Sequence, residues 1–152
     1  MKNKWIIIVV GIVIIVLIVI GLVLYFKFFN SEEIKSVCIN DECFEVEIAM
    51  DSESRELGLM GRESLCMNCG MLFVFENSGK HGFWMKNTLI SLDIIWINSD
   101  MRIVSIVEAE PCLTAECTAY TPLEDSMYVL EINYGFSREN GLKMGDLVEI
   151  NL

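Results

Sequence analysis

The fold of this chain is decided by two apolar runs that flank a polar turn: LDIIWI (residues 92–97), NSD (98–100) and RIVSIV (102–107). Ile, Val and Trp favour β-strands, whereas Asn, Ser and Asp favour turns. The pattern therefore predicts an antiparallel β-hairpin. Because a strand alternates its faces, side chains 92, 94 and 96 should face one side, and side chains 93, 95 and 97 the other.

Further strands are predicted on both sides of this hairpin. Residues 34–49 should form a second hairpin about Asn40-Asp41, since both residues tolerate the backbone of a tight turn. Other predicted elements are a strand at 71–75 buried on both faces, strands at 82–85, 127–132 and 147–150, a turn at 77–79, and short helices at 53–60 and 137–142. Strands dominate, so we expect a mostly-β α+β domain: a small compact sheet or partly open barrel with one or two short helices.

A long apolar segment precedes this domain. Residues 5–26 carry no charged side chain. As a helix they would measure about 33 Å, at about 1.5 Å per residue, and a membrane hydrocarbon core is about 30 Å thick. A cleaved signal peptide is the alternative, but its apolar stretch is usually shorter and ends in small residues. We therefore expect a single, uncleaved transmembrane helix.

The predicted organisation has four parts: a cytoplasmic N-terminus (1–4), a transmembrane helix (5–26), a short linker (27–33) and an extracytoplasmic domain (34–152). Lysine counts on the two sides of the span barely favour an inside amino terminus. All six cysteines lie in the domain, which favours an oxidising compartment. We therefore expect a single-pass protein of the cell membrane whose residues 5–26 contact lipid.

The cysteines form three close pairs: Cys38/Cys43, Cys66/Cys69 and Cys112/Cys117. Local disulfides are the favoured interpretation, because a two-residue loop in the first hairpin places the first pair directly across from each other. Zinc binding by thiolates is an alternative, although only one pair has the Cys-x-x-Cys spacing. A redox pair at that spacing is another, although no strand–helix unit frames it.

Charge is distributed unevenly along the chain. Overall, 11 Lys and Arg stand against 22 Asp and Glu, a formal net charge of −11. Residues 28–152 hold all the acidic residues and eight of the basic ones, which gives a net charge near −14. A segment with so many negative charges would repel the phosphate backbone of DNA or RNA, so we expect no nucleic-acid partner. P-loop, GxSxG and HExxH patterns are absent, so the sequence offers no catalytic residue, resident metal or cofactor.

Several motifs resemble a known family. They are RELGLMGR (55–62), GMLFVF (70–75), FWMKNTLISLDI (83–94), the stretch from PC (111–112) to Cys117 with Tyr120, YVLE (128–131) and GLKMGDLVE (141–149). Together they cover about residues 45–152 and are similar to domain of unknown function family 192. The resemblance implies a compact mostly-β fold, frequent export or anchoring, and no established activity. The first two cysteine pairs and the membrane span are additions to the family pattern.

A polar pocket is the candidate ligand-binding site. Its members would be five residues in or near these motifs: Glu56, Arg62, Lys86, Asn87 and Asp93. Asp93 interrupts an apolar strand, where a carboxylate needs a partner, and a basic residue such as Lys86 would supply the opposite charge. The simpler interpretation, a structural ion pair and a capped turn, is the one we favour for Asp93.

Three functions fit the sequence. We favour a membrane-anchored extracytoplasmic binding or accessory module of unknown ligand, without catalysis, that acts with a membrane complex or a cell-surface component. An enzyme of unknown reaction would use a pocket of Lys86, Asn87 and Asp93. A copper or zinc handling protein would use the cysteines, or methionines with His81, because thioether and imidazole suit copper. Methionine as a filler of the core is the simpler interpretation.

Overall fold

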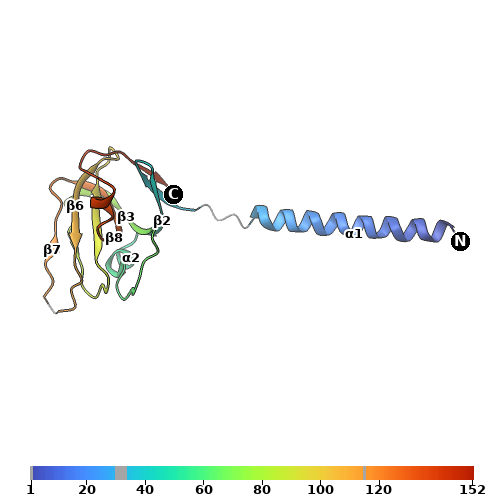
Figure 1. Ribbon diagram of the computed structural model, residues 1–152, viewed down its shortest axis with the longest axis horizontal. Helices are drawn as coiled ribbons and strands as arrows, with labels where there is room; N and C mark the ends of the chain where they lie inside the picture. The colour runs from blue at the N-terminus through green and yellow to red at the C-terminus, as the bar shows by residue number, and fades with distance from the viewer. Residues whose placement is uncertain (1, 30–33, 115) are drawn as a thin grey trace. The chain divides into compact units, whose positions relative to one another are not determined.

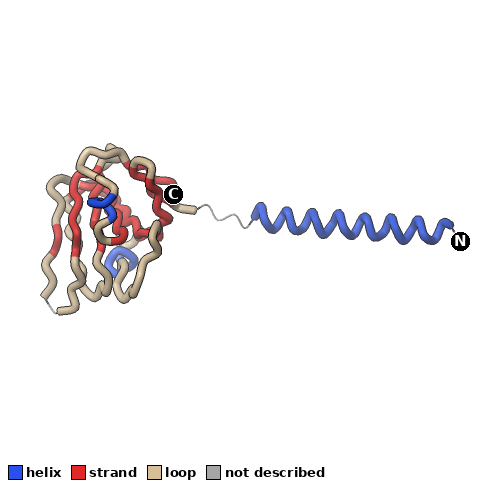
Figure 2. The backbone as a smooth tube through the Cα atoms, viewed as in Figure 1, coloured by secondary structure: helices blue, strands red, loops and turns tan. Residues whose placement is uncertain are grey.

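The computed structural model describes residues 2–29, 34–114 and 116–152. The chain divides into two compact units, Met1–Glu33 and Ile34–Leu152, and the second is called the β domain below. Helix α1, Lys2–Phe29, makes up the first unit (Figures 1 and 2). Its window Val9–Phe26 has a mean hydropathy of 3.3 and none of it is buried. By length and composition this helix can cross a membrane, and an N-terminal signal sequence has the same properties.

The β domain is built on one curled sheet with the strand order β6-β5-β8-β3-β2-β1-β9 (Figure 1). The bounds of these strands are β1 Ser36–Ile39, β2 Glu42–Ala49, β3 Cys69–Gly79, β5 Leu92–Ile97, β6 Ile103–Ala109, β8 Ser126–Asn133 and β9 Val148–Asn151. The remaining elements are a two-stranded ribbon of β4 (Phe83–Trp84) and β7 (Ala119–Tyr120), and two short helices, α2 (Ser52–Leu57) and α3 (Phe136–Glu139). The mostly-β α+β prediction is therefore confirmed.

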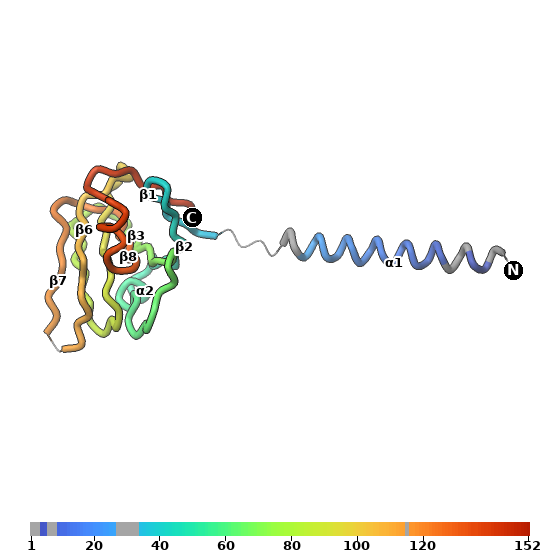
Figure 3. Tube along the Cα trace, in the orientation of Figure 1, coloured from blue at the N-terminus to red at the C-terminus, as the bar shows by residue number. Residues whose placement is uncertain are grey.

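The sheet is antiparallel except for the pair β2 and β3, which is parallel. Both predicted hairpins are present: β1 pairs with β2 so that Cys38 lies opposite Cys43, and β5 pairs with β6. The last strand, β9, lies against β1 at the edge of the sheet; in Figure 3 the red C-terminal segment lies beside the cyan segment of β1. The first and the last strand of the β domain, β1 and β9, are therefore neighbours at one edge of the sheet.

Two local predictions are wrong. The turn expected at 77–79 does not form, because β3 continues to Gly79 and pairs there with Ser126 after a register shift. The helix expected at 53–60 is shorter, because Gly58 has a φ of 48° and ends α2 by donating its N–H to the carbonyl of Ser54. A glycine with a positive φ commonly ends a helix, and its N–H satisfies an otherwise free carbonyl.

Each face of the sheet carries its own apolar core. One cluster gathers Val37, Ile39, Phe44, Val46, Leu72, Ile95, Ile97, Ile103, Leu130, Ile132, Leu142 and Val148. The other gathers Ala49, Leu59, Met71, Phe73, Met85, Leu92, Ile94, Trp96, Val104, Ala109 and Val129. The alternation predicted for β5 is confirmed, since its apolar side chains divide between the two clusters. The second face is covered by the segments around α2 and β4, and that is where a pocket forms.

Candidate ligand-binding pocket

A cavity of about 230 Å³ lies on the second face of the sheet. Its walls come from α2 and the turn after it, from β3, from β4 and from the middle of β8. The residues that line it are Arg55, Glu56, Leu57, Gly58, Leu59, Met60, Phe73, Phe75, Gly82, Phe83, Trp84, Thr88 and Glu131. Aromatic and aliphatic walls with few polar groups are the usual composition of a small-molecule site.

Helix α2 is held in place by a capping box. The Oδ1 of Asp51 accepts a hydrogen bond from the N–H of Ser54 at 2.8 Å, and the Ser54 hydroxyl accepts from the N–H of Asp51. The hydrogen bonds from Ser54 hold the pKa of the Asp51 carboxyl below its usual range. This cap fixes the first turn of a helix too short to be stable alone, and so fixes the rim of the pocket.

Arg55 extends from α2 along the pocket wall. Its guanidinium donates to the backbone carbonyls of Met50 and Val74, the latter at 2.9 Å, and lies 5.1 Å from the centre of the Phe75 ring. Its charge is therefore directed at backbone carbonyls and an aromatic face. Within the described residues it makes no ion pair with a pocket carboxylate.

Glu131 is the polar group at the floor of the pocket. It lies in β8 between Met71 of β3 and Ile94 of β5, and only 4% of its surface is exposed. None of the hydrogen bonds or ion pairs of the described residues reaches its carboxyl group. Burial without a partner raises the pKa of Glu131 from 4.5 to about 8, so the neutral acid predominates at pH 7.

A second cavity of about 350 Å³ adjoins the first, since the two share four lining residues. It is lined by Glu53, Glu56, Leu57, Met60, Trp84, Lys86 and Asn87. Lys86 places its Nζ 5.1 Å from the centre of the Trp84 ring. Asn87 has a φ of 55°, donates its N–H to the carbonyl of Cys112 and accepts from the N–H of Gly61. These contacts join the β4 segment to the rim around α2.

The five residues predicted for the site are divided by the structure. Glu56, Lys86 and Asn87 come together in the second cavity. Arg62 lies outside both cavities and makes an ion pair with Glu47 at 2.6 Å. Asp93 is fully buried and its side chain faces the other side of the sheet, toward α3.

The predicted pairing of Asp93 with Lys86 is wrong. The two Asp93 oxygens accept hydrogen bonds from the backbone N–H groups of Gly135 and Ser137, at 2.8 and 2.7 Å. These donors belong to the first turn of α3, where N–H groups have no partner within the helix and favour a negative charge. The carboxylate thus finds its partner in the backbone, which makes Asp93 a structural residue.

Glu131 was not predicted, although a signal for it is present. It interrupts an apolar strand, as Asp93 does, and strand alternation places it on the same face as Val129. Glu131 is therefore, like Asp93, a carboxylate within an apolar strand that needs a partner. The sequence does not indicate which of the two carboxylates finds backbone donors and which faces a cavity.

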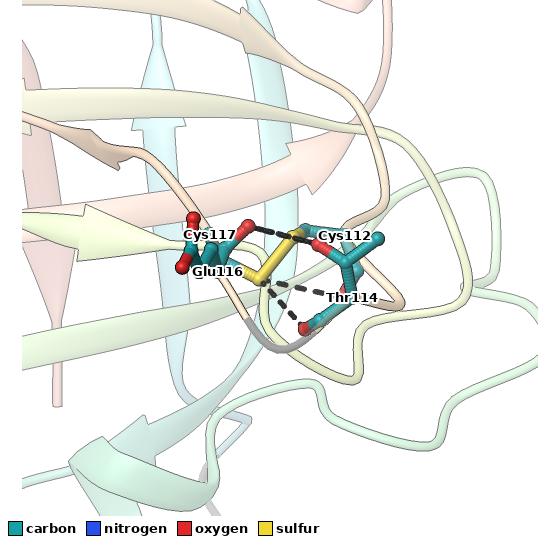
Figure 4. Close-up of a disulfide and its surroundings, with 4 residues drawn as sticks. All are labelled: Cys112, Thr114, Glu116 and Cys117. Carbon is teal, nitrogen blue, oxygen red and sulfur yellow. Dashed lines mark hydrogen bonds between the residues drawn. A yellow bond between two sulfur atoms is a disulfide. The ribbon is translucent and has the colours of Figure 1, made fainter.

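The cysteines lie in three pairs at disulfide-bonding distance, with the predicted local partners. Figure 4 shows the third pair, Cys112–Cys117, closing a loop in which the Thr114 hydroxyl donates to the carbonyl of Glu116. With each pair closed, no cysteine among the described residues is free. The described chain also holds no group of three or more His, Cys, Asp or Glu side chains arranged for a metal.

His81 and three of the methionines make packing or aromatic contacts. The His81 ring stacks on Phe75 at a centroid distance of 3.6 Å, and its Nε2 is 3.0 Å from the carbonyl of Asn77. Met71 and Met85 are buried in the core of the second face, and Met60 lines both cavities. These surroundings agree with the simpler interpretation of the methionines, as fillers of the core and of the cavity walls.

The geometry first defines a class of protein: a curled, mostly-β domain with a pocket on one face, preceded in the chain by an apolar helix. The family model of the uncharacterised domains DUF192, described as Uncharacterized ACR, matches residues 35–150, and the chain belongs to this family. No curated protein matches the chain.

Two solved structures share the fold. A protein of unknown function from Novosphingobium aromaticivorans DSM 12444 is 34% identical, covers 75% of this chain and 83% of its own, and has a TM-score of 0.70. A protein from Sinorhizobium meliloti 1021, named as a candidate transcription regulator, is 34% identical, covers 76% of this chain and 92% of its own, and has a TM-score of 0.69. Neither the family description nor these relatives assign a reaction to the fold.

Proposed function

We propose that this protein is a membrane-anchored extracytoplasmic module that binds a small ligand in the pocket beneath α2 and does not catalyse a reaction. The observation that carries the proposal is Glu131, a buried carboxyl group that lines a cavity and has no partner among the described residues. A buried polar group without a partner costs stability, so its retention at the floor of a cavity suggests a role in binding.

The character of the lining supports binding more than catalysis. The described residues that line the first cavity include no cysteine, serine, histidine or lysine, and its hydroxyl and carboxyl groups are those of Thr88, Glu56 and Glu131. No hydrogen bond of the described residues joins the Thr88 hydroxyl to either carboxyl group, so the lining offers no nucleophile paired with a base. The enzyme alternative also loses Asp93, because that carboxylate is bound by the backbone on the opposite face.

The anchor belongs to the same proposal. Residues 5–26 would lie in lipid with the amino terminus inside, and the β domain would lie outside the cytoplasmic membrane. Three closed cysteine pairs support an oxidising compartment for that domain. A membrane complex or a cell-surface component would then be the partner that delivers or receives the ligand. The strongly acidic domain does not favour nucleic acid as a partner.

A pair of tryptophan variants tests the pocket. Met60→Trp enlarges a residue that lines both cavities, whereas Met144→Trp enlarges an exposed methionine that lines neither. The full chain in detergent micelles would be screened by thermal shift against a library of small polar and amphipathic metabolites. We expect at least one compound to raise the Tm of the wild type and of Met144→Trp but not of Met60→Trp. A library without any such compound would refute the proposal, as would equal shifts in both variants.

A further inference from the structure

We infer that the ligand of this pocket is a compact organic cation, with an ammonium or methylated ammonium head that binds the Glu131 carboxylate between aromatic walls. The inference rests on the proposed function, because it names the chemical class of the ligand for that same pocket. Three features of the described residues support it: the missing counter-charge of Glu131, the aromatic lining, and the charge at the rim.

The first feature is the missing counter-charge. A carboxylate this deeply buried is normally paired with a cation or with several N–H donors. Asp93 has such donors at α3, but Glu131 has none among the described residues. Arg55, the basic residue in the lining of this cavity, is held by backbone carbonyls. A cationic ligand would complete the arrangement that the chain leaves open.

The second feature is the aromatic lining. Phe73, Phe75, Phe83 and Trp84 all line the cavity, and Phe73 and Phe83 meet edge to face at a centroid distance of 4.8 Å. The face of an aromatic ring attracts cations through its quadrupole, most strongly for Trp. Two of these rings already hold a cation of the chain itself, with Arg55 over Phe75 and Lys86 over Trp84. Ammonium groups are recognised by the same combination of rings and carboxylate.

The third feature is the charge around the entrance. Glu53 and Glu56 are exposed and line the adjoining cavity, where Lys86 is the single basic residue of the lining. An anionic ligand would bring its charge toward these carboxylates and toward Glu131. A cation would be attracted to the pocket, and the acidic surface of the domain would raise its rate of association.

Binding of such a cation would release a proton. Below pH 8 the neutral acid predominates at Glu131, so an ammonium ion that enters the pocket displaces the carboxyl proton to solvent and leaves a carboxylate–ammonium pair. Charge balances, because one positive charge enters and one leaves. The other charged groups in the lining of this cavity are Arg55 and Glu56.

Calorimetry on the full chain in detergent micelles tests this inference. The probes are tetramethylammonium chloride, ethylammonium chloride, the neutral isostere tert-butanol and sodium acetate, with a pH indicator in weakly buffered solution at pH 7. The variants are Glu131→Gln, which keeps the shape of the buried side chain, and Glu149→Gln, which removes a charge from an exposed position of β9 that lines neither cavity. Thermal melts confirm that each variant is folded.

We expect the two ammonium probes to bind the wild type with release of about one proton per site. Affinity should fall about tenfold to hundredfold in Glu131→Gln, since a charge-assisted contact is lost, and change less than about threefold in Glu149→Gln. Equal binding of tert-butanol, equal affinity in Glu131→Gln, or binding without proton release would overturn the cationic class. The Met60→Trp and Met144→Trp pair separates that result from failure of the pocket itself.

Discussion

Replacing Glu131 by Gln should stabilise the protein, and by an amount that depends on pH. The Glu131 carboxyl is buried, with a pKa near 8 in the folded chain against 4.5 for the free side chain. Below pH 4.5 the group is protonated in both the folded and the unfolded state, so its ionisation contributes nothing to the free energy of unfolding. Between these two values the unfolded chain ionises while the folded chain does not, so folded stability falls as pH rises.

The size of the effect follows from the two pKa values. Each pH unit between them costs about 1.4 kcal/mol, which amounts to about 3 to 4 kcal/mol from pH 5 to pH 8. Glutamine does not titrate, so the stability advantage of Glu131→Gln over the wild type should grow by that amount across this range and level off above pH 8. Glu56→Gln, at an exposed position, should show no such growth.

Urea unfolding of the full chain in detergent micelles, followed by the fluorescence of buried Trp96, gives the free energy of unfolding at each pH. A difference between Glu131→Gln and the wild type that stays constant within about 0.5 kcal/mol from pH 5 to pH 8 would refute the reasoning. It would mean that the Glu131 carboxyl ionises freely and that the pocket floor is wet.

Three further predictions concern the framework around the pocket. Asp93→Asn should lower the free energy of unfolding by about 2 to 4 kcal/mol, because the NH₂ group of the new amide cannot accept a hydrogen bond from one of the two backbone N–H donors at α3. The Tm should fall by about 10 °C, whereas Asp100→Asn should change it little, and an unchanged Tm in Asp93→Asn would contradict the structural role. Gly70→Ala should lower the stability measured in a thermal melt by about 1 to 3 kcal/mol, because the added Cβ would lie 2.7 Å from the carbonyl oxygen of Glu131. Gly79→Ala is the control and should lower stability much less, because the nearest atom to its Cβ would be 3.6 Å away. Replacing Cys38 and Cys43 by Ser should lower the free energy of unfolding by about 2 kcal/mol, the value expected for so short a closed loop. Non-reducing peptide maps of the wild type should recover the three local pairs, and a disulfide that joins cysteines of two different pairs would contradict the assignment.

Local pattern was sufficient for much of the fold. The hairpins β1–β2 and β5–β6 follow from alternating apolar residues around polar turns, and the opposition of Cys38 and Cys43 follows from the two-residue loop. The parallel pairing of β2 with β3 was not predictable in this way, because it joins strands separated by α2 and a long loop. The ribbon strand β7 was also missed, since two residues carry no periodicity.

The candidate site was predicted only in part, for a physical reason. Burial of Asp93 could be inferred from its apolar neighbours, but the partner came from backbone N–H groups more than forty residues away. Lys86 was close in sequence, yet its side chain lies over Trp84. Burial of Glu131 could likewise be inferred from the apolar residues around it in β8. The cavity beside it could not, because that cavity depends on how α2 and β4 pack. Sequence pattern indicates which carboxylates are buried, and tertiary packing decides their partners.

The ionisation of Glu131, measured directly in the folded protein, tests the central claim. A carbon-13 NMR titration of the side-chain carboxyl, assigned by its loss in Glu131→Gln, would be recorded with and without saturating tetramethylammonium. We expect a pKa near 8 in the free protein, and a clear fall in that pKa when the cation is bound. A free-protein pKa near the ordinary 4.5 would contradict the buried, unpartnered carboxyl, and a pKa unmoved by the cation would contradict the proposed ligand class.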